Sequence, residues 1–153
     1  MKINVTQPEK NSLETILVVE DDPIVLKVVA EILERAGFCV LVAGSGAQAI
    51  QMESMTQGTI HLLLSDVKMP DMSGPVVGHV LKKLRPAMRV IFMSGYPDGD
   101  MVLLNYGWHF IEKPFFPAKL VEKVNDILHT PERGQRDDQF DTRIQAKASG
   151  SAA

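Results

Sequence analysis

The chain has 153 residues, a length that favours one domain with a single hydrophobic core. Hydrophobic residues make up 45% of it and charged residues 23%, which is ordinary for a globular protein. The formal net charge of −3 predicts no basic surface, so we expect no direct binding to nucleic acid or to membranes. No segment has the length of a membrane span and residues 1–14 lack a signal core, so a cytoplasmic protein is expected.

Five short apolar runs recur along the chain and predict strands. They are rich in Val, Ile and Leu and mostly lack alternation, which indicates strands buried on both faces, as in a parallel sheet. The runs occupy residues 15–19, 38–43, 60–64, 90–93 and 108–111. Cys39, the single cysteine, lies in the second run; it excludes an internal disulfide, and we expect a small core side chain there rather than a reactive thiol.

Segments of helical periodicity separate these runs. Asp22 suits the start of the first helix and Gly37 its end. Ser45 and Gln48 predict a capping box for a weaker helix that runs to residue 55. A third apolar-periodic segment follows residue 75, and Pro117 suits the first turn of the last helix.

Strand and helix therefore alternate along the chain, which predicts an α/β fold. Right-handed crossovers place helices on both faces of the sheet and give a three-layer sandwich. From residue 131 onward the sequence is polar, with balanced charges and few large apolar residues. We expect residues 15–130 to form the domain, residues 1–14 a flexible leader and residues 131–153 a disordered tail.

Polar residues gather where the predicted strands end. Glu20 and Asp21 follow the first run, and Asp66 follows the third. Ser94 follows the fourth run, and Lys113 lies just after the fifth. In open α/β sheets functional groups sit at the carboxyl ends of the strands, at the point where the winding reverses. If the strand order is 2-1-3-4-5, that point lies between the two strands that end in acids.

This set of residues suits phosphoryl transfer. Converging carboxylates repel one another unless a cation neutralises them, and Mg²⁺ prefers such oxygen ligands. Lys113 adds a positive charge and Ser94 a hydroxyl, while Asp66 is placed to act as a nucleophile. Each residue also has an ordinary interpretation, as a solvated loop acid, a turn serine or a surface lysine. Their coincidence at four strand ends favours a site.

Four motifs in order resemble the response-regulator receiver domain, the CheY-like phosphoacceptor module of two-component signal transduction. They are ILVVEDD at 16–22, LLLSDVKMPDMSG at 62–74, IFMSGYPD at 91–98 and FIEKPF at 110–115. The resemblance implies a flavodoxin-like αβα sandwich with a five-stranded parallel sheet in the order 2-1-3-4-5.

The resemblance also implies roles for single residues. Asp66 resembles the phosphorylated aspartate, and Ser94 and Lys113 resemble the residues that contact the phosphoryl group. A cis bond before Pro114 is implied, and Phe110 resembles an aromatic switch residue, with plain core packing as the alternative. The implied Mg²⁺ ligands are Glu20 (through water), Asp21, Asp66 and the backbone carbonyl of Lys68.

The implied function is to accept a phosphoryl group on Asp66 from a histidine kinase or a histidine phosphotransfer protein, and to switch the surface seen by a downstream protein. Such a phosphorelay protein is not an enzyme, beyond catalysing its own phosphorylation and dephosphorylation.

The segment between Ser94 and Lys113 is a few residues shorter than is usual for the family, and we expect the loss to fall in a short helix at 98–105. The short segment and the serine at Ser94 resemble receivers of hybrid histidine kinases. We expect no second domain, so the receiver either stands alone or was part of a longer protein.

Three alternatives stay open at this point. A degenerate receiver would only bind a partner, although the complete residue set favours chemistry. A phosphatase of the haloacid-dehalogenase type would need an acid two residues after the nucleophile, where Lys68 stands. A flavodoxin-like nucleotide binder would need a phosphate-binding loop after the first strand, where acids stand instead.

Overall fold

The computed structural model describes residues 13–95 and 108–131. The predicted short helix at 98–105 lies outside these residues, as do most of the predicted leader and tail. The strands are β1 (Thr15–Val19), β2 (Cys39–Ala43), β3 (Leu62–Asp66), β4 (Arg89–Ser94) and β5 (His109–Glu112). The helices are α1 (Pro23–Arg35), α2 (Gly46–Met55), α3 (Gly74–Leu84) and α5 (Pro117–Leu128).

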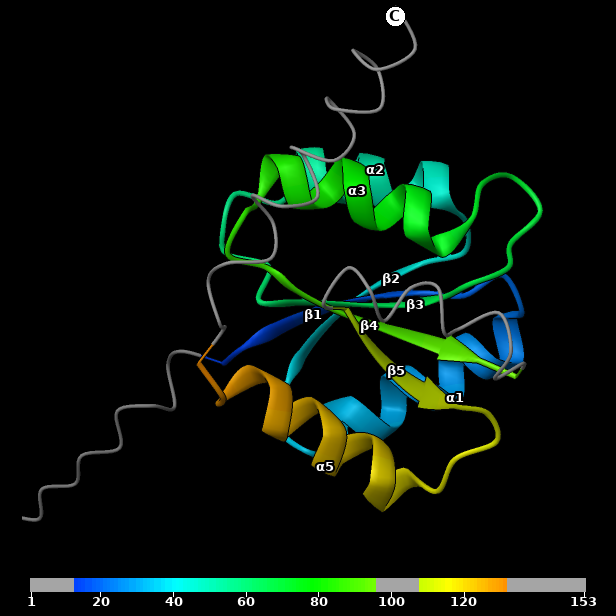
Figure 1. The fold of residues 1–153 in the computed structure, drawn as a ribbon, viewed down its shortest axis with the longest axis vertical. Helices are drawn as coiled ribbons and strands as arrows, with labels where there is room; N and C mark the ends of the chain where they lie inside the picture. The colour runs from blue at the N-terminus through cyan, green and yellow to red at the C-terminus, as the bar shows by residue number, and fades with distance from the viewer. Residues whose placement is uncertain (1–12, 96–107, 132–153) are drawn as a thin grey trace, which may run out of the picture.

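The strands form one parallel sheet in the order β2-β1-β3-β4-β5, which confirms the predicted fold class. Helices α2 and α3 cover one face of the sheet, and α1 and α5 cover the other (Figure 1). The winding reverses between β1 and β3. From β1 the chain passes through α1 to β2 on one side, and β3, β4 and β5 are then added in turn on the other side of β1.

Alternate residues of the central strands supply two apolar layers. Ile16 and Leu64 pack with α1 and α5, while Leu17 and Leu63 pack with α2 and α3. All four are fully buried. A strand covered on both faces needs apolar residues at every position, which is why these runs do not alternate.

The helix ends follow the predicted signals. Asp22 Oδ1 accepts hydrogen bonds from the backbone N–H of Ile24 at 2.9 Å and of Val25 at 3.4 Å, and Gly37 has a φ of +100°. The Ser45 hydroxyl accepts from the N–H of Gln48 at 3.1 Å. In a capping box the Gln48 side chain would accept in return from the N–H of Ser45. Here it accepts from the N–H of Gly44 instead, at 2.7 Å.

Two predictions about strands are corrected. The third strand spans Leu62–Asp66, so it begins two residues later than the apolar run at 60–64 and includes Asp66 as its last residue. Cys39 is exposed, because it begins an edge strand that pairs only with β1. Among residues 13–95 and 108–131, no helix has the length and apolar character that a membrane span requires.

Candidate functional site

The site lies at the carboxyl edge of the sheet, where β1 and β3 end side by side. These strands are parallel and in register, with Val19 opposite Ser65, so the next residues of both strands reach the same place. The backbone N–H of Glu20 still donates to the carbonyl of Ala43, at 3.1 Å. The end of β1 is thus held between its two neighbours.

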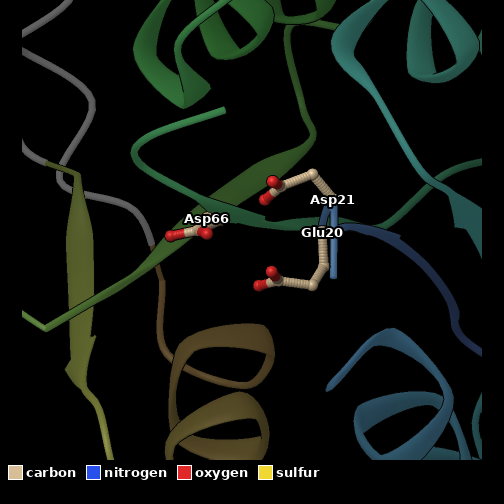
Figure 2. Close-up of side chains that lie close together, drawn as sticks. All are labelled: Glu20, Asp21 and Asp66. Atoms are coloured by element: carbon tan, nitrogen blue, oxygen red, sulfur yellow. The ribbon is translucent and has the colours of Figure 1, made fainter. Parts of the chain in front are cut away.

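Three carboxylates meet at this edge. Glu20, Asp21 and Asp66 each contribute one oxygen to a cluster in which all the oxygens lie within 4.8 Å of one another (Figure 2). Glu20 is 2% exposed, Asp21 is exposed and Asp66 is half-buried. Clustered carboxylate oxygens with an open side are the donor set that Mg²⁺ accepts, so these residues fit that ion.

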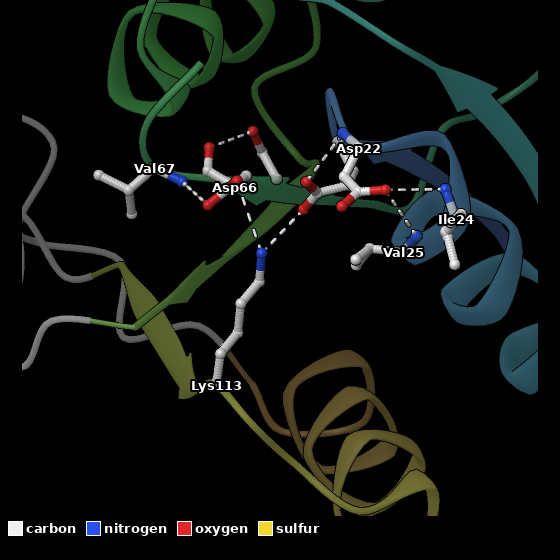
Figure 3. Close-up of polar contacts among 8 residues, drawn as sticks. Asp22, Ile24, Val25, Asp66, Val67 and Lys113 are labelled. Atoms are coloured by element: carbon white, nitrogen blue, oxygen red, sulfur yellow. Dashed lines mark hydrogen bonds and ion pairs between the residues drawn. The ribbon is translucent and has the colours of Figure 1, made fainter.

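Lys113 enters the acidic cluster from the end of β5. Its Nζ donates to Glu20 Oε2 at 2.9 Å and lies 3.5 Å from Asp66 Oδ2 (Figure 3). The lysine therefore neutralises part of the negative charge that the three acids bring together. The peptide bond between Lys113 and Pro114 is cis, as the family pattern implied.

The environment shifts two pKa values in this cluster. Burial raises the pKa of Glu20, and the charge of Asp66 adds to that rise, although the bond from Lys113 opposes it. Burial by itself would lower the pKa of Lys113, but its hydrogen bond to Glu20 and the charge of Asp66 outweigh burial and raise it. Lys113 is therefore held as a cation at neutral pH.

The backbone around Asp66 is fixed by short contacts. Its Oδ1 accepts from the N–H of Val67 at 2.9 Å, and its carbonyl accepts from the Ser65 hydroxyl at 2.8 Å (Figure 3). A Cβ on Gly74 would lie only 2.2 Å from that same carbonyl oxygen. Sequence reasoning did not assign Ser65 or Gly74 to the site, although both stand inside the motif that carries Asp66.

The resemblance also assigns roles to Ser94, Lys68 and Phe110. Ser94 is the last residue of β4 and is buried, and its carbonyl accepts from the N–H of Lys113 at 2.7 Å. Lys68 lies in the loop after β3 with an exposed side chain, and the metal-binding role of its carbonyl stays a prediction. Phe110 is half-buried, with its ring centroid 5.9 Å from that of Phe92, and its switch role also stays a prediction.

A doubly wound sheet with acids at its winding reversal and a lysine beside them defines a receiver-like protein. Residues 16–125 match the family model of the response regulator receiver domain. The chain belongs to this family, whose members act in two-component signalling.

Two curated relatives show how receivers are embedded in longer proteins. The chain is 33% identical to the sensor kinase CckA of Brucella abortus over 74% of this chain and 12% of that protein. It is 30% identical to the transcriptional regulatory protein CpxR of Escherichia coli over 89% of this chain and 60% of the relative. The chain thus spans less than two thirds of the length of each of these two relatives.

Solved receiver structures, by contrast, are covered almost completely. The receiver domain of the hybrid histidine kinase CckA is 34% identical, with a TM-score of 0.66 over 75% of this chain and 99% of that one. The response regulator TrrA of Thermotoga maritima, solved in complex with Mg²⁺ and BeF, is 26% identical, with a TM-score of 0.67 over the same shares.

Proposed function

We propose that this chain accepts a phosphoryl group on Asp66 in the presence of Mg²⁺. The observation that carries the proposal is the meeting of Glu20, Asp21 and Asp66 at one edge of the sheet, with Lys113 among them. Asp21 and Asp66 would hold the ion directly, and Glu20 would hold it through water. A bound Mg²⁺ would supply positive charge next to the phosphoryl oxygens.

In the proposed step, a carboxylate oxygen of Asp66 attacks the phosphorus of a phosphohistidine. The P–N bond of the donor breaks, the imidazole nitrogen takes a proton, and an acyl phosphate remains on Asp66. The Lys113 ammonium, 3.5 Å from Asp66 Oδ2, is close enough to pair with a phosphoryl oxygen there. The Ser94 hydroxyl, at the end of the next strand, is the proposed hydrogen-bond donor to another oxygen.

Water ends the phosphorylated state by attacking the same phosphorus, which releases inorganic phosphate and restores the Asp66 carboxylate. The chain then catalyses only its own phosphorylation and dephosphorylation. The new charge draws Lys113 away from Glu20, and the ends of β4 and β5 follow because Lys113 N–H is bonded to the Ser94 carbonyl. A downstream protein that prefers this arrangement would read the signal.

The proposed phosphoryl donor is a histidine kinase or a histidine phosphotransfer protein, as the hybrid-kinase and regulator relatives suggest. Exposed apolar side chains lie next to the site residues in the chain. Ile24 is 74% exposed three residues after Asp21, and Phe116 is 82% exposed three residues after Lys113. They belong to the α1 and α5 side of the sheet and are the proposed contact points for the donor.

The test is phosphorylation by a small donor. The protein is incubated with acetyl phosphate and Mg²⁺, and its intact mass is measured. We expect the gain of one phosphoryl group in the wild type and none in Asp66→Asn or without metal. Asp126→Asn, the same change at an exposed acid of α5, serves as the matched control and should behave as the wild type.

Two results would contradict the proposal. One is a folded wild type that gains no mass from acetyl phosphate or from a phosphorylated histidine kinase. The other is an Asp66→Asn variant that gains as much mass as the wild type. The first result would leave the chain as a receiver that only binds a partner.

A further inference from the structure

Asp71, in the loop between β3 and α3, binds the start of a different helix. Its Oδ1 accepts from the backbone N–H of Gly46 at 3.2 Å, and its Oδ2 accepts from that of Ala47 at 3.0 Å. These are the first two residues of α2, whose N–H groups have no partner within the helix. Asp71 thus ties the loop after Asp66 to α2.

Side-chain packing reinforces this tie. A Cβ on Gly46 would lie 2.2 Å from Met72 Cγ and 2.9 Å from Val77 Cγ2. The absence of a side chain at Gly46 therefore lets Met72, the residue after Asp71, sit against the first turn of α2. The loop is held to the helix by two hydrogen bonds and by an apolar contact.

The same loop is anchored to the acidic site at both of its ends. At its start, Val67 N–H donates to Asp66 Oδ1 at 2.9 Å. At its end, Gly74 N–H donates to the Val67 carbonyl at 2.8 Å, and Gly74 abuts the Asp66 carbonyl. Between these anchors the Asp71 contact to α2 is a further fixed point, and it limits where the backbone at Lys68 can lie.

We propose that Asp71 is a positioning residue for the metal site: by fastening the loop after β3 to α2, it holds the Lys68 carbonyl and the Asp66 carboxylate in the arrangement that binds Mg²⁺. This inference rests on the proposed function, since it assigns Mg²⁺ to the same site. Asp71 does not touch the ion. Outer residues that orient metal ligands change affinity by about tenfold or more when they are lost.

The test measures Mg²⁺ affinity by calorimetry in the wild type, Asp71→Ala and Asp71→Asn, with folding checked by circular dichroism. We expect the dissociation constant to rise about tenfold in Asp71→Ala. Asp71→Asn keeps one carbonyl oxygen as an acceptor and should lie between the two. It also preserves the test if the alanine variant does not fold.

A matched control separates loop positioning from helix stability. Ser45→Ala removes the cap on Gln48 N–H at the same end of α2 but leaves every contact of the loop in place. We expect it to lower the melting temperature without changing Mg²⁺ affinity. Hydrogen exchange of the Val67 and Gly74 amides, measured without metal, should become faster in Asp71→Ala and stay unchanged in Ser45→Ala.

The outcomes are distinguishable. If the wild type binds Mg²⁺ and the folded Asp71 variants bind it equally well, this inference is wrong and the proposed function stands. If Ser45→Ala weakens binding as much as Asp71→Ala, the effect comes from α2 stability and the inference is also wrong. If the wild type itself binds no Mg²⁺, the proposed metal chemistry fails and the inference fails with it.

Discussion

Gly74 shows how closely the backbone is packed around Asp66. A methyl group at this position would lie 2.2 Å from the Asp66 carbonyl oxygen and 3.1 Å from Phe92 Cδ1. The carbonyl cannot move away cheaply, because it belongs to the last residue of β3 and accepts the Ser65 hydroxyl. Crowding of this kind forces the backbone to shift.

We therefore expect Gly74→Ala to lower the free energy of unfolding by about 3 kcal/mol. Gly58→Ala is the matched control, because a Cβ there meets no atom within 4 Å, and it should change stability little. Urea unfolding followed by the fluorescence of Trp108, the single tryptophan, measures both. Equal stabilities of the two variants would show that the loop yields to the methyl group.

The pair of Lys113 and Glu20 gives a second prediction at this level. Glu20 is almost fully buried, and Lys113 is the cation that donates to it. Lys113→Met would leave a buried carboxylate without that partner, at a cost of about 2 kcal/mol in metal-free buffer; the value is below that of a fully buried pair because Lys113 is partly exposed.

Adding Glu20→Gln to Lys113→Met should restore most of the lost stability, because the almost fully buried carboxylate is then gone and only the half-buried Asp66 keeps a charge next to residue 113. Chemical unfolding of the wild type, both single variants and the double variant forms the complete cycle. Additive losses in the double variant would mean that the two side chains do not act as a pair.

The first turn of α2 is held by a contact that local patterns do not reveal. The spacing of Ser45 and Gln48, three positions apart, predicts a cap, and the Ser45 hydroxyl accepts from Gln48 N–H. Asp71 satisfies two further N–H groups of this turn from 24 and 25 residues away along the chain. Only the folded topology brings these segments together, so the sequence predicted the helix but not the anchor of its first turn.

The charge of Asp71 leads to a pH-dependent prediction. Hydrogen bonds from the N–H groups of Ala47 and Gly46 lower the pKa of this carboxyl below its usual value. Because the folded pKa is lower than the unfolded one, the stabilisation is complete above about pH 4 and is lost as the pH falls through the folded pKa. The melting temperature of Asp71→Asn should thus lie below that of the wild type at pH 7, and the gap should close in acid.

Ser45→Ala provides the comparison for this pH series. It removes an uncharged cap from the same helix, so its difference from the wild type should not change with pH. If the difference in melting temperature between the wild type and Asp71→Asn stays constant down to pH 3, the negative charge of Asp71 does not stabilise the fold.

The arrangement of the whole sheet was predictable because it follows from general rules. Apolar runs without alternation indicated buried parallel strands, and the acids at the ends of β1 and β3 marked the winding reversal. What could not be read was the start of β3. The pairing of β3 with β1 begins at Leu62, which lies opposite Ile16. Just before it, the His61 ring accepts a hydrogen bond from Thr15 N–H at 2.9 Å. The apolar run therefore predicted a strand start that is two residues too early.

The strand ends also connect the site to the stability of the entire domain. Mg²⁺ that binds the folded acidic cluster, and not the unfolded chain, must stabilise every element that positions the cluster. At a concentration ten times the dissociation constant, the gain is about 1.4 kcal/mol. For a domain of this size that corresponds to a rise of roughly 5 °C in melting temperature.

Trp108 offers a direct readout of this effect, because it is 8% exposed and its ring centroid lies 5.1 Å from that of Phe92 in the core. Thermal unfolding is followed by its fluorescence at increasing Mg²⁺, with EDTA as the zero point. In the variant Glu20→Gln/Asp21→Asn/Asp66→Asn, the rise should vanish, since the three carboxylates are gone. An equal rise in this variant would place the bound Mg²⁺ elsewhere on the molecule, because no other change separates the two proteins.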